Sequence, residues 1–387
     1  MKILFGIYLS LFVITCKAQT FPVNVGAEDT SVYLPVLKNK RVAVLSNHTG
    51  LVGDEHLVDL LKRKEINLVA IFSPEHGFRG NADAGEHVTN STDEKTGIPI
   101  LSLYDGKDSK PSTESIQMFD LLLFDLQDVG LRFYTYYITM VRMMDVCAEH
   151  GKKMIVLDRP NPNGYYVDGP ILDMKHKSGV GWLPIPVVHG LTLGELALMV
   201  NGEKWLPQQR ACDLTVVRCR NYTRHTMYRL PVAPSPNLPD MKSVYLYPST
   251  CLFEGTVMSL GRGTPFPFQV YGHPDMKGCT FSFTPQSTFG AKNPPLLGKL
   301  CYGTDLRKIP KEEIWKKGID LSYIIDAYKN LNIGNSFFSP FFEKLIGVDY
   351  VRQMIELGKN ADEIKAVWKD DVEKFKKQRR KYLLYEE

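Results

Sequence analysis

The sequence predicts an α/β protein with a doubly wound, mostly parallel sheet, followed by a second, smaller α+β domain. From residue 40 to about residue 220, strand-like and helix-like segments alternate, as they do where helices connect parallel strands. Several strand-like segments are continuously apolar, which is typical of strands buried on both faces. Near residue 230 proline and glycine become frequent. We therefore expect one domain over residues 19–230 and another over residues 231–387.

The expected elements of the first domain follow from residue periodicity. Strands are predicted where β-branched and other apolar residues run together, at residues 41–46, 67–73, 98–104, 120–125, 153–158 and 214–218. Helices are predicted where apolar residues recur every three or four positions, at residues 54–64, 135–150 and 192–200. Thr192 is expected to cap the last of these helices, with Glu195 completing a capping box.

The second domain has a different composition. Four prolines between residues 231 and 239 suggest a linker or a wall of a cleft. Residues 279–284 alternate like a strand, and residues 314–331 and 349–357 are expected to be helical. A final helix over residues 362–381 would bury one face. That face comprises Ile364, Val367, Trp368, Val372 and Phe375.

Composition and motifs exclude several function classes. The net charge of +4 is too small to indicate nucleic-acid binding. No G-x-G-x-x-G follows a strand, and neither a P-loop nor a G-x-S-x-G elbow is present. No C-x-x-C pair supports structural zinc. We therefore expect no cofactor and no metal.

Residues 1–18 have the form of a secretory signal peptide. Lys2 precedes an apolar run, and Ala18 is a suitable small residue for cleavage. We expect an exported, periplasmic or extracellular protein with no stable membrane span. Acylation of Cys16 is the less favoured alternative, because Thr15 fits a lipobox poorly. The six cysteines left after cleavage give no disulfide connectivity.

Four polar loops follow predicted strands, at residues 47–50, 74–87, 127–134 and 158–164. Because the carboxyl ends of parallel strands meet at one edge of a sheet, these loops should converge on a site. In the second loop, Glu75 lies on a turn after Pro74, between Phe72 and Phe78. Such surroundings should raise the pKa of Glu75 and suit a general acid. An ion pair with Arg79 that only orders the loop is about equally consistent with the spacing.

Other ionisable residues extend this site. His76 and His87 flank the second loop, and with His48 and Asp128 they offer metal-ligand types. Their spacing matches no known ligand motif, so hydrogen-bonded loop histidines are favoured. Glu86 is a second carboxylate on the loop, or a surface group.

Arginines and aromatic residues at the same edge suggest a ring-shaped ligand that carries an acid group. Asp128, Arg132 and Tyr134 lie just after a buried strand, and arginine can bind a carboxylate through two nitrogens. An ion pair between Asp128 and Arg132 is the structural alternative. Glu254 and Arg262, in glycine-rich loops of the second domain, either close the cleft or order those loops.

Together these motifs resemble the NamZ family, long carried as a domain of unknown function. They are SNHTG at 46–50, SPEHGFRG at 73–80 with AGEH at 84–87, DLQDVGLRFY at 125–134, DRPNPNG at 158–164 and EGT at 254–256. The resemblance implies a Rossmann-like domain, a smaller domain and a site in the cleft between them. It also implies an exo-β-N-acetylmuramidase that releases N-acetylmuramic acid from the non-reducing ends of peptidoglycan fragments.

Residue roles follow from the resemblance. Glu75 matches the catalytic glutamate, taken as the acid. Arg79, Arg132 or Arg262 would bind the lactyl carboxylate, and Tyr134 would pack on the sugar ring. The candidate substrate-binding residues are Asn47, His48, His76, Arg79, His87, Arg132, Tyr134, Asp158, Asn161, Glu254 and Arg262.

The second catalytic group is open between Asp128 and Glu86. Retaining enzymes hold their two carboxyl groups about 5 to 5.5 Å apart, and inverting enzymes about 6.5 to 9.5 Å. Alternatively, the sugar's own 2-acetamido group attacks and Asp128 orients it. Two other function classes also remain. One is a non-catalytic cell-wall sugar-binding protein, and the other is a metal-dependent hydrolase using His48, His76 and Asp128.

Overall fold

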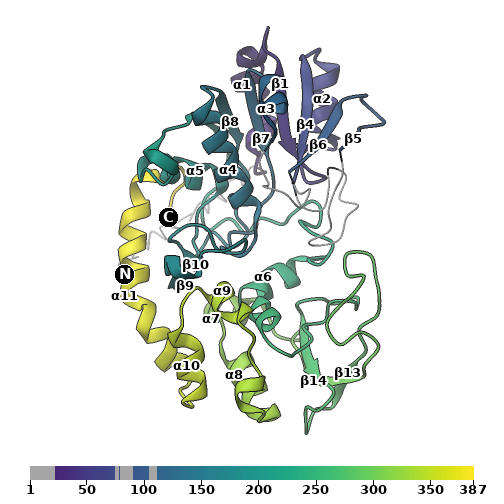
Figure 1. The fold of residues 1–387 in the computed structure, drawn as a ribbon, viewed down its shortest axis with the longest axis vertical. Coiled ribbons are helices and arrows are strands. Elements are labelled where there is room, and N and C mark those ends of the chain that lie inside the picture. Colours follow the sequence, from purple (N-terminus) through teal and green to yellow (C-terminus); the bar gives the residue numbers. More distant parts are fainter. Residues whose placement is uncertain (1–21, 75–77, 79–89, 104–110) are drawn as a thin grey trace, which may run out of the picture.

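The computed structural model describes residues 22–74, 78, 90–103 and 111–387. Within these residues the largest sheet has seven strands in the order β11-β8-β7-β1-β4-β6-β5. All neighbouring strands are parallel except β5, which is antiparallel to β6. The predicted mostly parallel sheet is therefore confirmed (Figure 1). The strands are β1 (Val42–Ser46), β4 (Leu68–Ser73), β5 (Ser91–Thr92), β6 (Pro99–Ser102), β7 (Leu121–Asp125), β8 (Lys153–Leu157) and β11 (Asp213–Val217).

This sheet is buried on both faces because successive side chains of a strand point to opposite sides. Ala43 and Leu45 of β1 belong to a core cluster shared with α4 (Tyr136–Glu149) and α5 (Leu193–Gly202). Val42 and Val44 belong to a cluster shared with α1 (Thr30–Leu37) and α2 (Leu57–Arg63). A further short helix, α3 (Thr113–Gln117), precedes β7. Helices on both faces leave the loops at the strand ends as the place for a site.

Two helix predictions need correction. The helix expected over residues 54–64 begins only at Leu57, because residues 55 and 56 form β3 (Glu55–His56), which pairs with β2 (Leu51–Val52) across a turn at Gly53. The helix expected over residues 314–331 is two helices, α7 (Lys311–Lys317) and α8 (Ser322–Leu331). Gly318 ends the first of them with a φ of +63°, a conformation that glycine adopts without steric cost.

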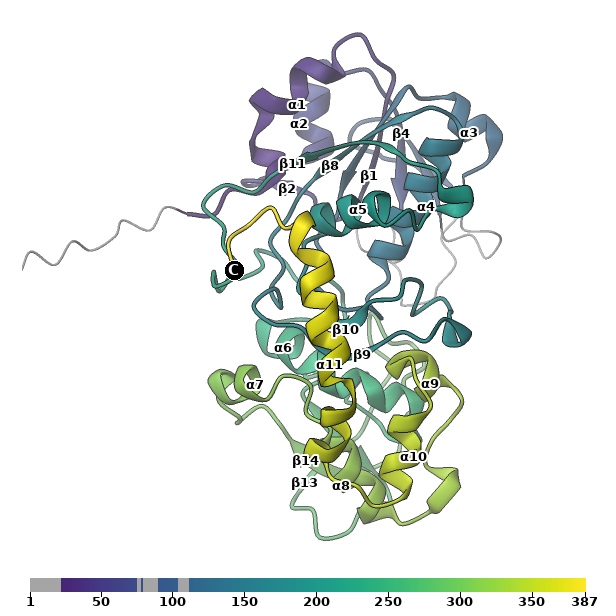
Figure 2. The same cartoon turned by 90° about the vertical axis from the view of Figure 1, so that its left-hand side faces the viewer.

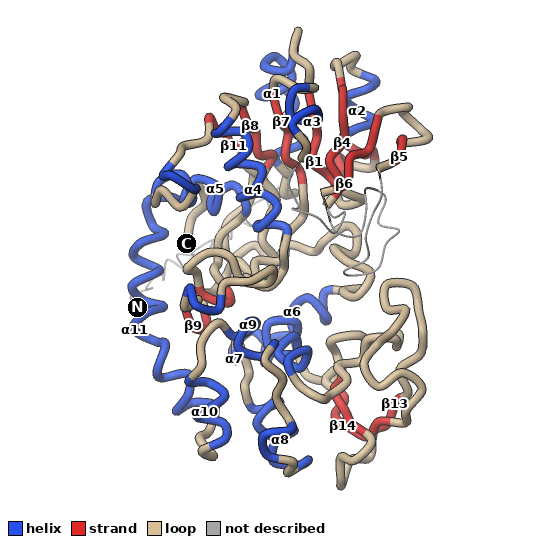
Figure 3. The backbone as a smooth tube through the Cα atoms, viewed as in Figure 1, coloured by secondary structure: helices blue, strands red, loops and turns tan. Residues whose placement is uncertain are grey.

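The smaller second domain combines an antiparallel sheet with helices, as predicted (Figure 3). Its sheet has the order β12-β14-β13, formed by β12 (Val270–His273), β13 (Phe281–Phe283) and β14 (Cys301–Asp305). Its other helices include α6 (Met241–Thr250), α9 (Phe341–Ile346) and α10 (Tyr350–Glu356). One hydrophobic cluster runs from Ala43 to Phe375 and joins both parts. The boundary at residue 230 stays a prediction.

The C-terminal helix α11 (Ala361–Arg379) runs alongside both parts of the molecule (Figure 2). It contacts β9 (Asp168–Ile171), which pairs with β10 (Pro186–Val188). Four of the five residues predicted to face inward are buried, whereas Val367 is 49% exposed. The helix therefore ties the chain end to the first domain.

The described residues also bear on the cysteines and on membrane insertion. They include six cysteines, all free thiols, and Cys147 is buried. In this part of the chain no helix is both long and apolar enough to cross a membrane.

Candidate functional site

Three of the four predicted loops meet at the carboxyl edge of the sheet. The backbone N–H of Gln127 donates to the Thr49 hydroxyl at 3.1 Å, and the Gln127 side chain donates to the carbonyl of Pro160 at 2.8 Å. The Asn47 side chain donates to the Tyr136 hydroxyl at 2.8 Å. The loops after β1, β7 and β8 therefore form one connected rim.

The fourth loop lies largely outside the described residues. Only Pro74, which is buried after β4, and Phe78, which is 3% exposed, are described there. The Phe78 ring lies edge-on to His56, with ring centroids 5.0 Å apart. The predicted site residues Glu75, His76, Arg79, Glu86 and His87 all lie outside the described part of the chain.

The proline-rich segment 231–239 lies against this rim. The Nε2 atom of His48 lies 2.8 Å from the carbonyl oxygen of Ala233. The Tyr134 hydroxyl donates to the carbonyl of Pro234 at 2.7 Å. Two predicted site residues thus contact this segment, which forms a wall at the rim.

Asp128 is buried at the rim with one carboxylate oxygen unused. Its Oδ1 atom accepts a hydrogen bond from the backbone N–H of Gly130 at 2.6 Å. Its Oδ2 atom is buried and has no hydrogen-bond partner among the described residues. Burial raises the pKa of Asp128 to about 7, although backbone hydrogen bonds from Gly130 and Val129 oppose that shift. A carboxyl group of this kind changes protonation near neutral pH.

Arg132 is fully buried and binds backbone carbonyls, not a carboxylate. Its two terminal nitrogens donate to four carbonyl oxygens at 2.7–3.1 Å, those of Pro170, Ile185, Leu345 and Ile346. Burial lowers the pKa of Arg132 to about 10. A Cβ atom at Gly347 would lie 2.4 Å from the guanidinium. Arg132 therefore joins the two domains and forms no ion pair with Asp128, and carbonyl oxygens occupy the terminal nitrogens that the expected ligand contact would use.

Asp158 and Asn161 support the loop after β8. The Asp158 carboxylate accepts four hydrogen bonds at 2.6–3.0 Å, from the backbone N–H groups of Arg159 and Gly194 and the hydroxyls of Thr192 and Tyr385. Burial raises the pKa of Asp158 to about 6, although the bonds from Thr192 and Tyr385 oppose the shift. The Asn161 side chain donates to the carbonyl of Leu191 and accepts from the N–H of Asn163. This geometry favours a structural role over the substrate contact expected from sequence.

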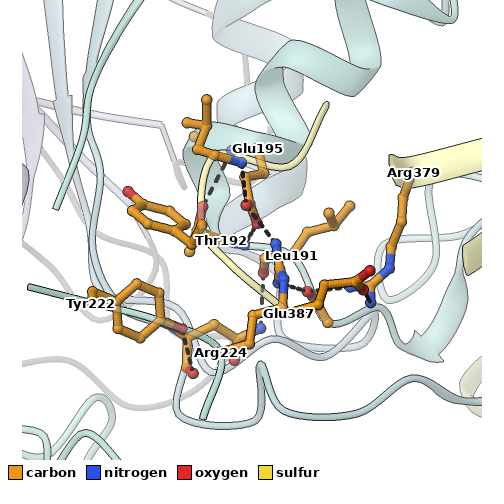
Figure 4. Close-up of polar contacts among 12 residues, drawn as sticks. Leu191, Thr192, Glu195, Tyr222, Arg224, Arg379 and Glu387 are labelled. Carbon is orange, nitrogen blue, oxygen red and sulfur yellow. Dashed lines mark hydrogen bonds and ion pairs between the residues drawn. The ribbon is translucent and has the colours of Figure 1, made fainter. Parts of the chain in front are cut away.

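The chain end completes this buried network (Figure 4). Thr192 and Glu195 form the predicted capping box of α5, which is confirmed. The Glu195 carboxylate also pairs with Arg224 at 2.5 Å and accepts the N–H of Leu384 at 2.7 Å. Leu384 and Tyr385 are not predictable from the sequence, because no local pattern shows that the C-terminal residues pack beside a distant strand.

A cavity of about 150 Å³ lies between the domains and brings other predicted residues together. Its lining includes Tyr134, Tyr136, Ser235, Asn237, Glu254 and Arg262. Arg262 pairs with Glu254, because its Nε and Nη2 atoms both donate to Oε1 at 3.0 and 2.5 Å. No described residue accepts a hydrogen bond from Nη1 of Arg262. The guanidinium therefore keeps one donor edge for a ligand.

Two features hold this arginine and shape its cavity. The guanidinium carbon lies 4.9 Å from the ring centroid of Phe268, a cation–π contact. Phe268 has a φ of +62°, which is a costly conformation for a bulky residue and is often found at functional sites. The proline pattern of segment 231–239 predicts a linker or a wall, but it does not single out Ser235 or Asn237.

Metal-ligand residues do not cluster in the described part of the chain. No group of three histidine, cysteine, aspartate or glutamate residues there could hold a metal ion. His48 and Asp128, two of the suggested ligands, instead make the contacts given above.

Both halves of the chain match one protein family. The N-terminal model of the exo-β-N-acetylmuramidase NamZ family matches residues 42–242, and its C-terminal model matches residues 245–385. The peptidoglycan β-N-acetylmuramidase NamZ of Bacillus subtilis (strain 168) is 40% identical over 384 residues, covering 91% of this chain and 89% of that protein.

Two crystal structures share the fold. A DUF1343 family protein from Bacteroides fragilis NCTC 9343 is 66% identical with a TM-score of 0.90, and the match covers 95% of this chain and all of that one. A second DUF1343 protein of the same organism is 28% identical with a TM-score of 0.79, covering 94% of this chain and 99% of that one. The chain therefore belongs to the NamZ exo-β-N-acetylmuramidase family and is a homologue of a glycoside hydrolase.

Proposed function

We propose that this protein removes N-acetylmuramic acid from the non-reducing ends of peptidoglycan fragments. The observation that carries the proposal is the match of both halves to the family models. Incubation with the disaccharide N-acetylmuramyl-N-acetylglucosamine should release both sugars. Binding without release would instead indicate a non-catalytic sugar-binding protein. We also propose export, because residues 1–18 have the composition of a signal peptide.

We propose Glu75 as the general acid that protonates the leaving oxygen. It directly follows the buried Pro74 at the end of β4, and Phe72 and Phe78 on either side in sequence are both buried. Apolar surroundings favour the protonated carboxyl group that a general acid needs. Glu86 stays the alternative second carboxylate on the same segment.

The cavity at Arg262 is our proposed site for the lactyl carboxylate. Of the three candidate arginines, Arg132 has both terminal nitrogens bonded to carbonyls, and Arg79 lies outside the described residues. Arg262 keeps its Nη1 edge available, and Tyr134 and Tyr136 line the same cavity. A charge-assisted bond between guanidinium and carboxylate would select a sugar acid over its neutral analogue.

Replacing Arg262 by alanine is expected to raise KM for the disaccharide about 10- to 100-fold, since hydrogen bonds to charged groups contribute about 1.5–3 kcal/mol. Inhibition by the free sugars should show the cause: the affinity for N-acetylmuramic acid falls, while that for N-acetylglucosamine changes little. Arg352→Ala is the matched control, because Arg352 also pairs with a glutamate and lies over a phenylalanine ring. Equal losses for both sugars would contradict the assignment.

We propose that ionised Asp128 orients the 2-acetamido group of the sugar. The support is its unused buried oxygen, which suits the N–H of an acetamido group. In this arrangement the acetamido oxygen attacks the anomeric carbon and Asp128 stabilises the positive charge that develops.

The activity and the stability should both depend on the protonation of Asp128. Because its pKa is about 7, kcat/KM should fall as the pH decreases through about 7. Asp128→Asn should lower activity about 10²–10³-fold, as expected for loss of a group that stabilises transition-state charge, and should abolish this pH dependence. Since the unfolded carboxyl has a pKa of about 3.9, the folded protein binds the proton more tightly. Asp128 therefore contributes less to stability as the pH rises from about 4 to about 7.

Paired measurements of wild type and Asp128→Asn test this assignment. The difference between their melting temperatures should change between about pH 4 and pH 7 and stay constant above it. If kcat/KM of the wild type and of Asp128→Asn depends on pH in the same way, Asp128 does not take part in the reaction.

A further inference from the structure

A groove of about 650 Å³ lies on the second domain beside the cavity at Arg262. One wall is the proline-rich segment, through Pro236, Asn237 and Pro239. The other is formed by two segments, the loop at residues 263–267 and residues 282–289, which run from the end of β13 into a second loop. The second loop carries Phe289, which is 67% exposed. An aromatic ring exposed at the rim of a groove offers a flat apolar face on which a ligand can pack.

The groove lining is uncharged but rich in hydrogen-bonding groups. Phe266, Phe283, Phe289 and four prolines provide flat apolar surfaces, whereas Asn237, Thr264, Gln286 and other residues provide amides and hydroxyls. A pyranose ring has the matching chemistry, with an apolar C–H face and polar edges. A second cavity of about 650 Å³, across the same segment, contains Arg229, Asp240 and Lys311 and is suited to charged groups. The uncharged groove therefore fits a neutral sugar better.

Asn237 connects the groove to the cavity at Arg262, because it lines both. Its side-chain nitrogen donates to the carbonyl of Gly290 at 2.6 Å, which fixes the loop that carries Phe289. None of the described residues donates a hydrogen bond to its side-chain oxygen. Gly290 has a φ of +85°, and a Cβ atom there would lie 2.6 Å from Pro236. The close contact of loop and wall thus requires glycine and positions Phe289 at the rim.

We propose that this groove binds the neutral N-acetylglucosamine residue, and the glycan beyond it, on the leaving-group side of the scissile bond. The proposal rests on the proposed function, because it takes the cavity at Arg262 as the site of the terminal sugar acid. An exo-acting enzyme must let the rest of its substrate leave that cavity, and the groove starts at a residue the two share. Phe289 packs on a sugar ring, and Asn237 and Gln286 bond its polar edges.

Binding of the neutral probe triacetylchitotriose, measured by isothermal titration calorimetry, tests the groove without requiring turnover. Phe289→Ala should weaken binding about fivefold, as expected for loss of an aromatic contact. Leu300→Ala is the matched control, because Leu300 is 49% exposed in the same domain and does not line the groove. It should bind the probe as the wild type does.

Hydrolysis provides the second measurement. The ratio of kcat/KM on a peptide-free tetrasaccharide to kcat/KM on 4-nitrophenyl β-N-acetylmuramide should fall about fivefold in Phe289→Ala. If the wild type cleaves neither substrate but Phe289→Ala still weakens probe binding, the proposed function fails, and the groove is then a neutral-sugar site without a leaving-group role. Unchanged probe binding in Phe289→Ala overturns the assignment. A wild-type dimer that this variant dissociates would also overturn it, because a second copy would then occupy the groove.

Discussion

Glu75→Gln is expected to lower the rate of N-acetylmuramic acid release from the disaccharide by about 10²–10⁴-fold, the usual contribution of a general acid. Glutamine preserves the size and much of the hydrogen bonding of glutamic acid but has no acidic proton to transfer to the leaving oxygen. The rest of the protein should fold normally, which circular dichroism and the melting temperature would show. The disaccharide needs this proton most, because an alkoxide is a poor leaving group.

Comparison of leaving groups makes this prediction specific to acid catalysis. 4-Nitrophenolate leaves readily without protonation, so Glu75→Gln should lose much less activity on 4-nitrophenyl β-N-acetylmuramide than on the disaccharide. Glu86→Gln is the matched control on the same segment and should affect both substrates equally if Glu86 is not the acid. If Glu75→Gln loses the same factor of activity on both substrates, Glu75 is not the general acid.

The sheet was predictable from sequence because each of its strands and covering helices has a local pattern of apolar residues. Strands such as β7 and β8 are short apolar runs buried on both faces, and α4 and α11 are long enough to show a clear period. The hairpin at residues 51–56 is too short for a period. Gly318 divides α7 from α8 although the apolar pattern continues on either side of it. These errors arose where a backbone turn overrides side-chain periodicity.

The position of the candidate site was predictable, but the roles of its residues were not. Parallel strands bring the loops after β1, β7 and β8 together, as the hydrogen bonds of Gln127 show. Arg132 and Asp158 belong to the same polar motifs, yet both are buried and bonded to the protein itself. A motif shows only that a polar side chain is required at a position. Whether that side chain stabilises the loop or contacts a ligand depends on its burial and its hydrogen-bond partners, which the sequence does not give.

Among the buried polar contacts that hold the loops at the carboxyl edge of the sheet, the ion pair between Asp125 and Arg159 has the largest expected effect on stability. Asp125 ends β7 and Arg159 follows β8, and their side chains are 0% and 3% exposed. Two hydrogen bonds of 2.6 and 2.9 Å join them, and Arg159 also donates to the carbonyl of Leu51. Burial favours the neutral form of Arg159, but the Asp125 charge outweighs it, and the pKa of Arg159 is raised.

Arg159→Ala is expected to lower the free energy of unfolding by about 3–5 kcal/mol, because it leaves the Asp125 carboxylate buried without its partner. Urea unfolding at constant pH measures the change. Arg41→Ala is the matched control, because Arg41 pairs with Asp120 just before the other end of β7, where both side chains are exposed. Its effect should be small. The double variant Asp125→Leu/Arg159→Leu should recover much of the loss, since it removes both charges. Similar losses in Arg159→Ala and Arg41→Ala would show that burial does not make this pair more important than a surface one.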